Sequence, residues 1–512
     1  MDFGYMVIGF LIVYFISLIS TGIFASKNMA NLEDFMLAGR KLDPLVLALT
    51  YSSTGMSGWL ALGFAGYTYE KGFQSLWIMV PSATIGIFLS YVLVSKRLRQ
   101  YSEKIGAITI TEVIKKRFHD DRNVLTFITT LIICAAAIAY VSGQLIAMGK
   151  LLNIVLNWNY QISIIIAVMI IIIYTVLGGF LAVCWTDFIQ GILMITGSLM
   201  AGCLAIMYAG GFSELSLRLA NVSRSYPEFT ITPFEGTSII IMGLSLFIGD
   251  GILNWIGQPT LMVRYMAAKD SKTLTSATII TITIQLILFL GVFIAAIYMR
   301  TQFPEPSLLP YSGDTETVLI QFFITITHPI LVGIFIGAIM AAVMSTADSL
   351  LMMATSVLIN DVYSYLNPKA SQSYLILISR ITTIFLGIVS VVISLNKNSV
   401  LWLSWFGWTT LGIIGAPIII GLFWKKTTRT GAIAGLVSGF IILLLWNAMD
   451  LTVRLNIFQA LPACGTAYLV TFIVSMFTAP PPPYILQDIK NLGFQKSMNK
   501  GEVEVHYNNT KN

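Results

Sequence analysis

Thirteen apolar runs constrain the fold of this chain more than any other feature. A transmembrane helix needs about 20 mostly apolar residues, and each run is close to that length. The runs cover residues 4–25, 44–66, 73–95, 124–150, 160–180, 182–209, 237–263, 274–299, 330–361, 373–395, 399–424, 430–448 and 457–478. Only Gly178-Gly179 marks the break between the fifth and the sixth. We therefore expect an all-α polytopic membrane protein with no sizeable soluble domain.

The composition argues against a soluble protein, a metalloenzyme and a nucleic-acid-binding protein. Of 512 residues, 56% are hydrophobic and only 11% are charged, whereas soluble domains carry about 25% charged residues. The four cysteines lie in apolar runs and the three histidines are scattered, so neither a metal centre nor an enzyme site is indicated. The net charge of +6 comes without basic clusters interleaved with aromatic residues, so we expect no nucleic-acid partner.

Most of the 30 lysines and arginines fall in alternate loops, including Arg264, Lys269 and Lys272 after the seventh run. Because cytoplasmic loops are enriched in positive charge, this asymmetry predicts an outside N-terminus, a cytoplasmic C-terminus and an odd number of spans in the plasma membrane. Residues 479–512 form the predicted cytoplasmic tail, in which four consecutive prolines, 480–483, follow Ala479.

The ninth run carries a polar face. Ser345, Asp348 and Ser349 are spaced i, i+3 and i+4, so a helix places them on one side, with Thr346 at its edge. An aspartate at the membrane centre costs about 2.5–3.5 kcal/mol, which a bound cation would offset. Two interpretations are open: oxygen ligands for a small hard cation, or a hydroxyl face that packs on another helix with Asp348 near the aqueous mouth.

Two of the runs contain helix breaks. Residues 50–58 of the second run are nearly all small or polar, and residues 249–259 of the seventh contain three glycines and a proline. Freed carbonyls at such breaks can bind ions and substrates. The broken runs are five spans apart, which predicts two inverted five-helix repeats, 44–236 and 237–424, with 1–43 and 425–478 added outside the repeats.

Several ordered motifs resemble a known family. They are Glu33–Arg40, Met56–Leu60, Gly178–Asp187, Gly257–Pro259 with Arg264–Ala268, and Ala341–Thr346. Together they resemble the sodium:solute symporter family, and within it most closely the bacterial sodium/proline symporters. The resemblance implies a ten-helix core of two inverted repeats and alternating access driven by sodium.

The resemblance also implies ligands for Na+. The backbone carbonyls of Ser53, Met56 and Ala342 and the hydroxyls of Ser345 and Thr346 match the family's main sodium site. Oxygen donors of this kind suit a hard cation.

Asp187 belongs to a candidate second site. Some family members bind a second sodium near the matching aspartate, which here would use Asp187, Asp348 and Ser349 for a cation or a proton. From its spacing alone, Asp187 could equally be a surface aspartate near a helix N-terminus.

The substrate is expected at the break in the second span. The predicted binding residues are Ser57, Gly58, Trp59, Tyr140, Trp255 and Gln258. The chain departs from the proline branch at Gly55, where that branch has an aspartate, and at Gly251 and Trp255, where it has a tryptophan and a tyrosine. Because Asp348 replaces a small residue, we hypothesise that the charge missing at position 55 has moved to Asp348.

We therefore predict a sodium-coupled symporter that imports a small solute, proline first. The alternatives are sodium- or proton-coupled symport of another amino acid, an organic acid or a sugar, and a transporter-like sensor. A sensor would need a signalling domain, and the tail is short for one. Retention of Ser345 and Thr346 argues against a uniporter that has lost its sodium site.

Overall fold

The computed structural model describes residues 3–27, 32–231, 237–326, 329–396 and 399–482. Most of the predicted tail, from residue 483 onward, lies outside this range. The long helices are α1 (Phe3–Ser26), α3 (Pro44–Gly58), α8 (Val124–Leu156), α9 (Tyr160–Ala209), α13 (Ser271–Gln302), α15 (Pro329–Ser356), α17 (Gln372–Ser394), α18 (Val400–Phe423), α19 (Arg429–Ala448) and α21 (Ala460–Phe477).

Shorter segments complete the spans and connect them. They include α2 (Leu32–Leu37), η2 (Trp59–Phe64), α4 (Ala65–Lys71), η3 (Ser75–Met79), α5 (Val80–Leu89), η4 (Ser90–Ser95), α6 (Lys96–Lys104), α7 (Ile110–Phe118), α10 (Phe212–Ser225), α11 (Thr237–Ser245), η5 (Leu246–Asn254), α12 (Pro259–Ala267), α14 (Val318–Ile326), η8 (Val357–Tyr363), α16 (Ser364–Leu366) and α20 (Leu451–Leu455). No regular strand occurs among the described residues. This confirms the predicted all-α architecture.

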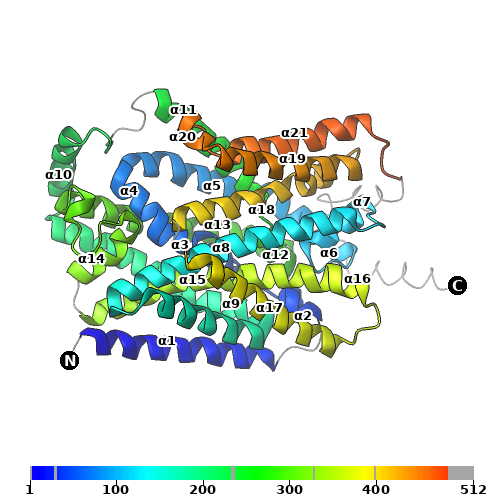
Figure 1. The fold of residues 1–512 in the computed structure, drawn as a ribbon, viewed down its shortest axis with the longest axis horizontal. Helices are drawn as coiled ribbons and strands as arrows, with labels where there is room; N and C mark the ends of the chain where they lie inside the picture. The colour runs from blue at the N-terminus through cyan, green and yellow to red at the C-terminus, as the bar shows by residue number, and fades with distance from the viewer. Residues whose placement is uncertain (1–2, 28–31, 232–236, 327–328, 397–398, 483–512) are drawn as a thin grey trace.

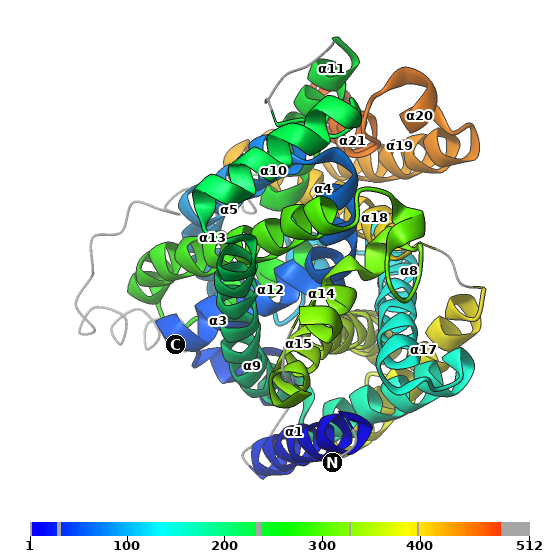
Figure 2. The same cartoon turned by 90° about the vertical axis from the view of Figure 1, so that its left-hand side faces the viewer.

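The long helices run roughly side by side as a bundle (Figure 1). Seen along their length, α1 lies at one edge and the α19–α21 pair at the opposite edge (Figure 2). α3, α8, α15 and α18 lie between them, and α3 packs against α9, α13 and α15. The α3 helix is buried throughout its middle, so its polar residues face protein rather than lipid.

In the described ranges, twelve helices are long and apolar enough to cross a membrane. One of them, α9, has 50 residues and would be about 75 Å long if straight, more than twice the hydrocarbon thickness. It bends at Gly179, where φ is 56° and ψ is −153°. A Cβ added to Gly178 would meet the Cβ of Ala182, which a straight helix keeps about one turn away. The two halves of α9 are therefore the predicted fifth and sixth spans, and the thirteen predicted spans agree with the structure.

Both predicted helix breaks are present. The backbone of α3 leaves helical geometry at Ser57, where φ is 31° and ψ is −178°, and a π-helical segment, η2, continues the span after Gly58. The seventh predicted span combines α11, η5 and α12, with non-helical backbone at Gly257 and Gln258. These breaks place irregular backbone inside the bundle, where protein rather than lipid surrounds it.

Candidate functional site

Oxygen atoms from α3 and α15 converge next to the α3 break. The Ser345 hydroxyl donates to the carbonyl oxygens of Ser53 at 3.0 Å and Ala342 at 3.2 Å. The Thr346 hydroxyl donates to the carbonyl of Thr54 at 2.9 Å and to that of Ala342 at 3.4 Å. All these residues are buried. Since each hydroxyl also has acceptor lone pairs, the cluster has the donor chemistry that a hard cation needs.

Met56 stands apart from these hydrogen bonds. Its carbonyl accepts the backbone N–H of Trp59, across the non-helical residue Ser57. The structure thus joins four of the five predicted sodium ligands directly and places the fifth, Met56, at the break itself.

An arginine occupies the predicted second cation site. Arg264 Nη2 lies 3.3 Å from Asp187 Oδ2 and donates to the hydroxyls of Ser349 and Thr54, each at 2.6 Å. Thr50 also donates to Asp187 Oδ2, at 2.5 Å. The side chains of Arg264 and Asp187 are 1% and 0% exposed. The assignment of Arg264 to a cytoplasmic loop was therefore wrong, and the guanidinium supplies the positive charge between Asp187 and Ser349.

Asp348 is the second buried carboxylate near this arginine. Tyr174 donates to Asp348 Oδ2 at 2.7 Å from the first half of α9. Among the described residues, no donor reaches Oδ1 of Asp348 or Oδ1 of Asp187. One guanidinium therefore faces two carboxyl groups, so both can be ionised together only if a further positive charge is present.

The residues at the α3 break form hydrogen bonds with α8. The hydroxyls of Ser57 and Tyr140 are 3.0 Å apart, and the Trp59 N–H donates to Ser57 Oγ at 2.9 Å. The Gly58 N–H donates to Gln144 Oε1 at 2.8 Å. A Cβ on Gly58 would lie only 2.7 Å from this same oxygen, so glycine is needed for the contact.

A small cavity lies beside this break, with a volume of about 10 Å³. It is lined by Gly55, Trp59, Tyr140, Asp250, Trp255, Ser404, Trp405 and Trp408. Three of the six predicted substrate residues, Trp59, Tyr140 and Trp255, thus surround one space. Gln258 instead supports the wall, because its amide donates to the Trp408 carbonyl at 2.8 Å and to Asn254.

The structure also explains the departure at Gly251. A Cβ there would collide with Ser82 on α5, so this position packs between helices and is not part of the cavity lining. Sequence reasoning missed Asp250, Ser404, Trp405 and Trp408. The available signals were the aspartate within the seventh-span break and the regular three-residue spacing of Trp402, Trp405 and Trp408.

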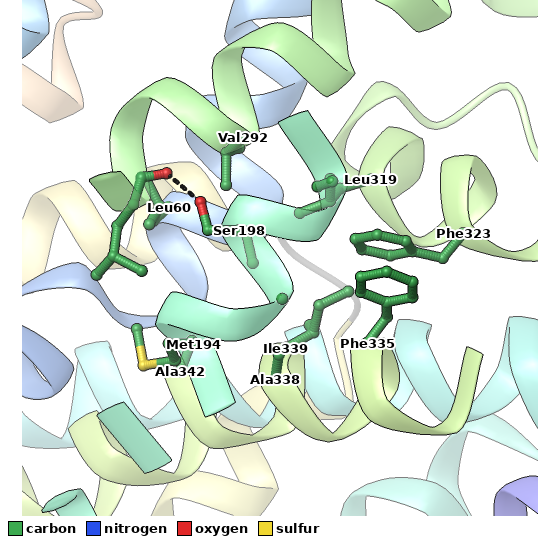
Figure 3. Close-up of a pocket in the computed structure, with 14 residues that line it drawn as sticks. Leu60, Met194, Ser198, Val292, Leu319, Phe323, Phe335, Ala338, Ile339 and Ala342 are labelled. Carbon is green, nitrogen blue, oxygen red and sulfur yellow. Dashed lines mark hydrogen bonds between the residues drawn. The ribbon is translucent and has the colours of Figure 1, made fainter. Parts of the chain in front are cut away.

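A second cavity, beside Ala342, is almost entirely apolar (Figure 3). Phe323 and Phe335 stack across one side, with ring centroids 3.8 Å apart. The one hydroxyl in its lining, Ser198 Oγ, donates to the Leu288 carbonyl at 2.8 Å. Its fourteen lining residues include no ionisable group, so it does not suit a charged solute.

A wider cavity of about 420 Å³ lies near the start of α18. Lys150 lines it and contacts Asp314 and Glu316, each at 2.6 Å. Glu316 also accepts the backbone N–H groups of Val400 and Leu401 at the N-terminus of α18. Burial raises the pKa of Glu316, but Lys150 and these hydrogen bonds more than offset it and hold the pKa below its ordinary value.

Comparison with known proteins identifies the family. A model of the sodium:solute symporter family matches residues 35–439, which include both broken spans and α15. The chain belongs to the sodium:solute symporter family. The high-affinity proline transporter PutP of Bacillus subtilis is 32% identical over 464 residues, which cover 90% of this chain and 96% of that protein. The sodium/proline symporter of Staphylococcus aureus is 31% identical and covers 94% of each chain.

A solved structure shares the fold of this sodium:solute symporter. It is the outward-open form of a Na+-coupled sialic acid symporter, with a TM-score of 0.75 and 20% identity, and the match covers 94% of this chain and 99% of that one. The architecture is therefore the five-plus-five inverted-repeat core with broken helices that the sequence predicted. The protein is a membrane transporter and not an enzyme.

Proposed function

We propose that this protein is a sodium-coupled symporter that imports a small solute, with proline as the first candidate. The observation that carries the proposal is that the proposed sodium ligands and the substrate cavity lie on the same broken helix. Ser53 and Thr54 place carbonyls against the α15 hydroxyls, and Trp59, just after the break, lines the cavity. A sodium ion bound before the break can thus order the substrate-binding residues after the break. The proline relatives support proline as the solute.

Sodium acts here as a co-transported ion. Its proposed ligands are the carbonyls of Ser53, Met56 and Ala342 and the hydroxyls of Ser345 and Thr346. On binding, these hydroxyls would turn their lone pairs to the ion, which then links α3 to α15. The ion stabilises whichever conformation holds these helices together, and the difference in affinity between conformations supplies the coupling.

The transport cycle would be alternating access between the repeats 44–236 and 237–424. Segments 1–43 and 425–478 would be peripheral, consistent with α1 and the α19–α21 pair at opposite edges of the bundle. We place the protein in the plasma membrane with its N-terminus outside and its C-terminus in the cytoplasm, following the distribution of lysine and arginine.

The group of Asp187, Asp348 and Ser349 is proposed as a site for one further monovalent cation or proton. Arg264 offsets one of the two carboxylates, and Tyr174 alone donates a side-chain hydrogen bond to Asp348 among the described residues. A proton or a sodium ion at Asp348 would balance the remaining charge. This observation favours a second candidate, a symporter coupled to a proton as well as to sodium.

Replacing Asp348 with Asn tests the second site. We expect the pH dependence or sodium dependence of uptake to change, because the variant no longer needs a compensating positive charge. If both dependences equal those of the unchanged protein, Asp348 has no part in ion coupling.

The proposed function is tested by uptake of labelled proline into proteoliposomes. We expect proline to accumulate under an inward sodium gradient and to fail to do so when potassium replaces sodium. Sodium-dependent uptake of a different solute would keep the mechanism and replace proline. Equal uptake in sodium and potassium would refute sodium coupling.

A further inference from the structure

We propose that Asp250 and the aromatic rings around it bind the positively charged nitrogen of the transported solute, and that this nitrogen is alkylated, as in proline or a betaine, rather than a primary ammonium. The inference rests on the proposed transport function and specifies its substrate class. At about 10 Å³ the cavity has room for about one water in this conformation, so the solute would bind after the surrounding helices move apart during alternating access. The cavity carries one formally charged side chain, Asp250, among its eight lining residues. A single carboxylate in a space removed from bulk water favours a cationic partner.

The aromatic lining favours the same partner. Five rings surround the cavity: Trp59, Tyr140, Trp255, Trp405 and Trp408. They stand mostly edge to face, with centroids 4.8 Å apart for Trp255 and Trp408 and 6.1 Å for Tyr140 and Trp408. Faces of this kind attract ammonium groups, above all alkylated ones, and a desolvated site strengthens the attraction.

Asp250 places a carboxylate in the space beside Gly55, the position at which the proline branch has an aspartate. Gly55 lines the same cavity as Asp250, and a Cβ on Gly55 would touch the Trp255 ring at 3.4 Å. The proline branch has an aspartate at position 55, so in this chain a carboxylate enters the same space from the seventh span. This placement replaces the hypothesis that the charge missing at position 55 moved to Asp348, which contacts Tyr174 and lines no part of this cavity.

Ring faces rather than hydrogen-bond acceptors make up most of the lining. Five of the eight lining residues are aromatic, and Asn254 already donates to Asp250 Oδ1 at 3.0 Å. A primary ammonium would bury N–H groups against these rings, which is costly, whereas an alkylated nitrogen has few or none.

Trp59 has an indole N–H that could bind the carboxylate end of the solute. Its indole nitrogen is buried and has no hydrogen-bond partner among the described residues, although the ring lines the cavity. A free N–H donor suits a solute carboxylate. The cavity therefore favours a zwitterion over a simple cation.

The experiment compares binding and transport of glycine betaine, L-proline and glycine. Binding to the purified protein is followed by tryptophan fluorescence, and uptake is measured in proteoliposomes. We expect glycine betaine or proline to bind at least tenfold more tightly than glycine, and Asp250→Asn to weaken that binding at least tenfold. Asp361→Asn is the matched control, because Asp361 is also a buried carboxylate but bonds to Thr109, away from the cavity.

A second pair of variants tests the inference independently, in case Asp250→Asn does not fold. Trp405→Phe keeps an aromatic face and should retain binding, whereas Trp405→Leu should lose it. Ligand binding that depends on Asp250, without sodium-driven uptake, would refute symport and keep the inference. Sodium-driven uptake with an unchanged KM in Asp250→Asn, equal affinity for glycine, or binding of none of the three solutes would overturn the inference.

Discussion

Arg264 shows how buried charges of opposite sign organise the middle of the bundle. Its guanidinium links three helices, because Asp187 lies on α9, Thr54 on α3 and Ser349 on α15. Removing such charges from water costs several kcal/mol, which good geometry can offset. Arg264 thus holds together the same helices that supply the proposed sodium ligands.

Replacing Arg264 with Gln should lower stability by about 3–5 kcal/mol, because it leaves Asp187 as an uncompensated buried charge. Adding Asp187→Asn to that variant should recover much of the loss. Thermal unfolding of the two single variants and the double variant measures the interaction. Additive losses in the double variant would show that the two side chains do not stabilise each other.

Individual site residues were predictable to different degrees from the sequence. Ser345 and Thr346 stood out because they lie within one turn of a carboxylate, Asp348, inside an apolar run, and the structure joins them to Ser53 and Thr54. Arg264 did not stand out, because a charge near the end of a predicted span resembles a loop residue. Only the three-dimensional arrangement shows that α12 carries it into the core.

At the scale of elements, the broken helices were predictable because clustered glycine and proline weaken regular helix and favour a break. The bends at Ser57, Gly179 and Gly257–Gln258 all fall in stretches that the sequence marks. The cavity lining was less predictable, since Trp405 and Trp408 come from α18, far from the breaks in sequence. Aromatic residues are common in transmembrane helices, so their spacing alone does not reveal a binding site.

The N-terminus of α18 should respond to pH through Glu316. Its pKa is below the ordinary value near 4.5, so its stabilising contribution is present above that value and is lost as pH falls through the folded-state pKa. Glu316→Gln should lower stability at neutral pH by about 2 kcal/mol and reduce the decline on acidification. The measurement is thermal unfolding against pH, with Glu214→Gln at an exposed helix as control. Identical pH profiles for the unchanged protein and Glu316→Gln would contradict this role.

At the scale of the whole molecule, the two proposed sites share α3, so ion and solute should assist each other. Span number and core architecture followed from hydropathy and from the spacing of the breaks. The closure of the cavity to about 10 Å³ could not be predicted, because it depends on how the side chains of α3, η5, α8 and α18 pack together.

The most direct measurement is equilibrium binding of labelled proline at a series of sodium concentrations, in the unchanged protein and in Ser345→Ala. Sodium should raise proline affinity, and proline should raise sodium affinity by the same factor. Ser345→Ala should shift the sodium dependence about tenfold toward higher concentration, since it removes one charge-assisted contact. Ser379→Ala, on α17, is the control. Proline binding that does not change with sodium, or a Ser345→Ala variant with unchanged sodium dependence, would contradict coupling through the broken helix.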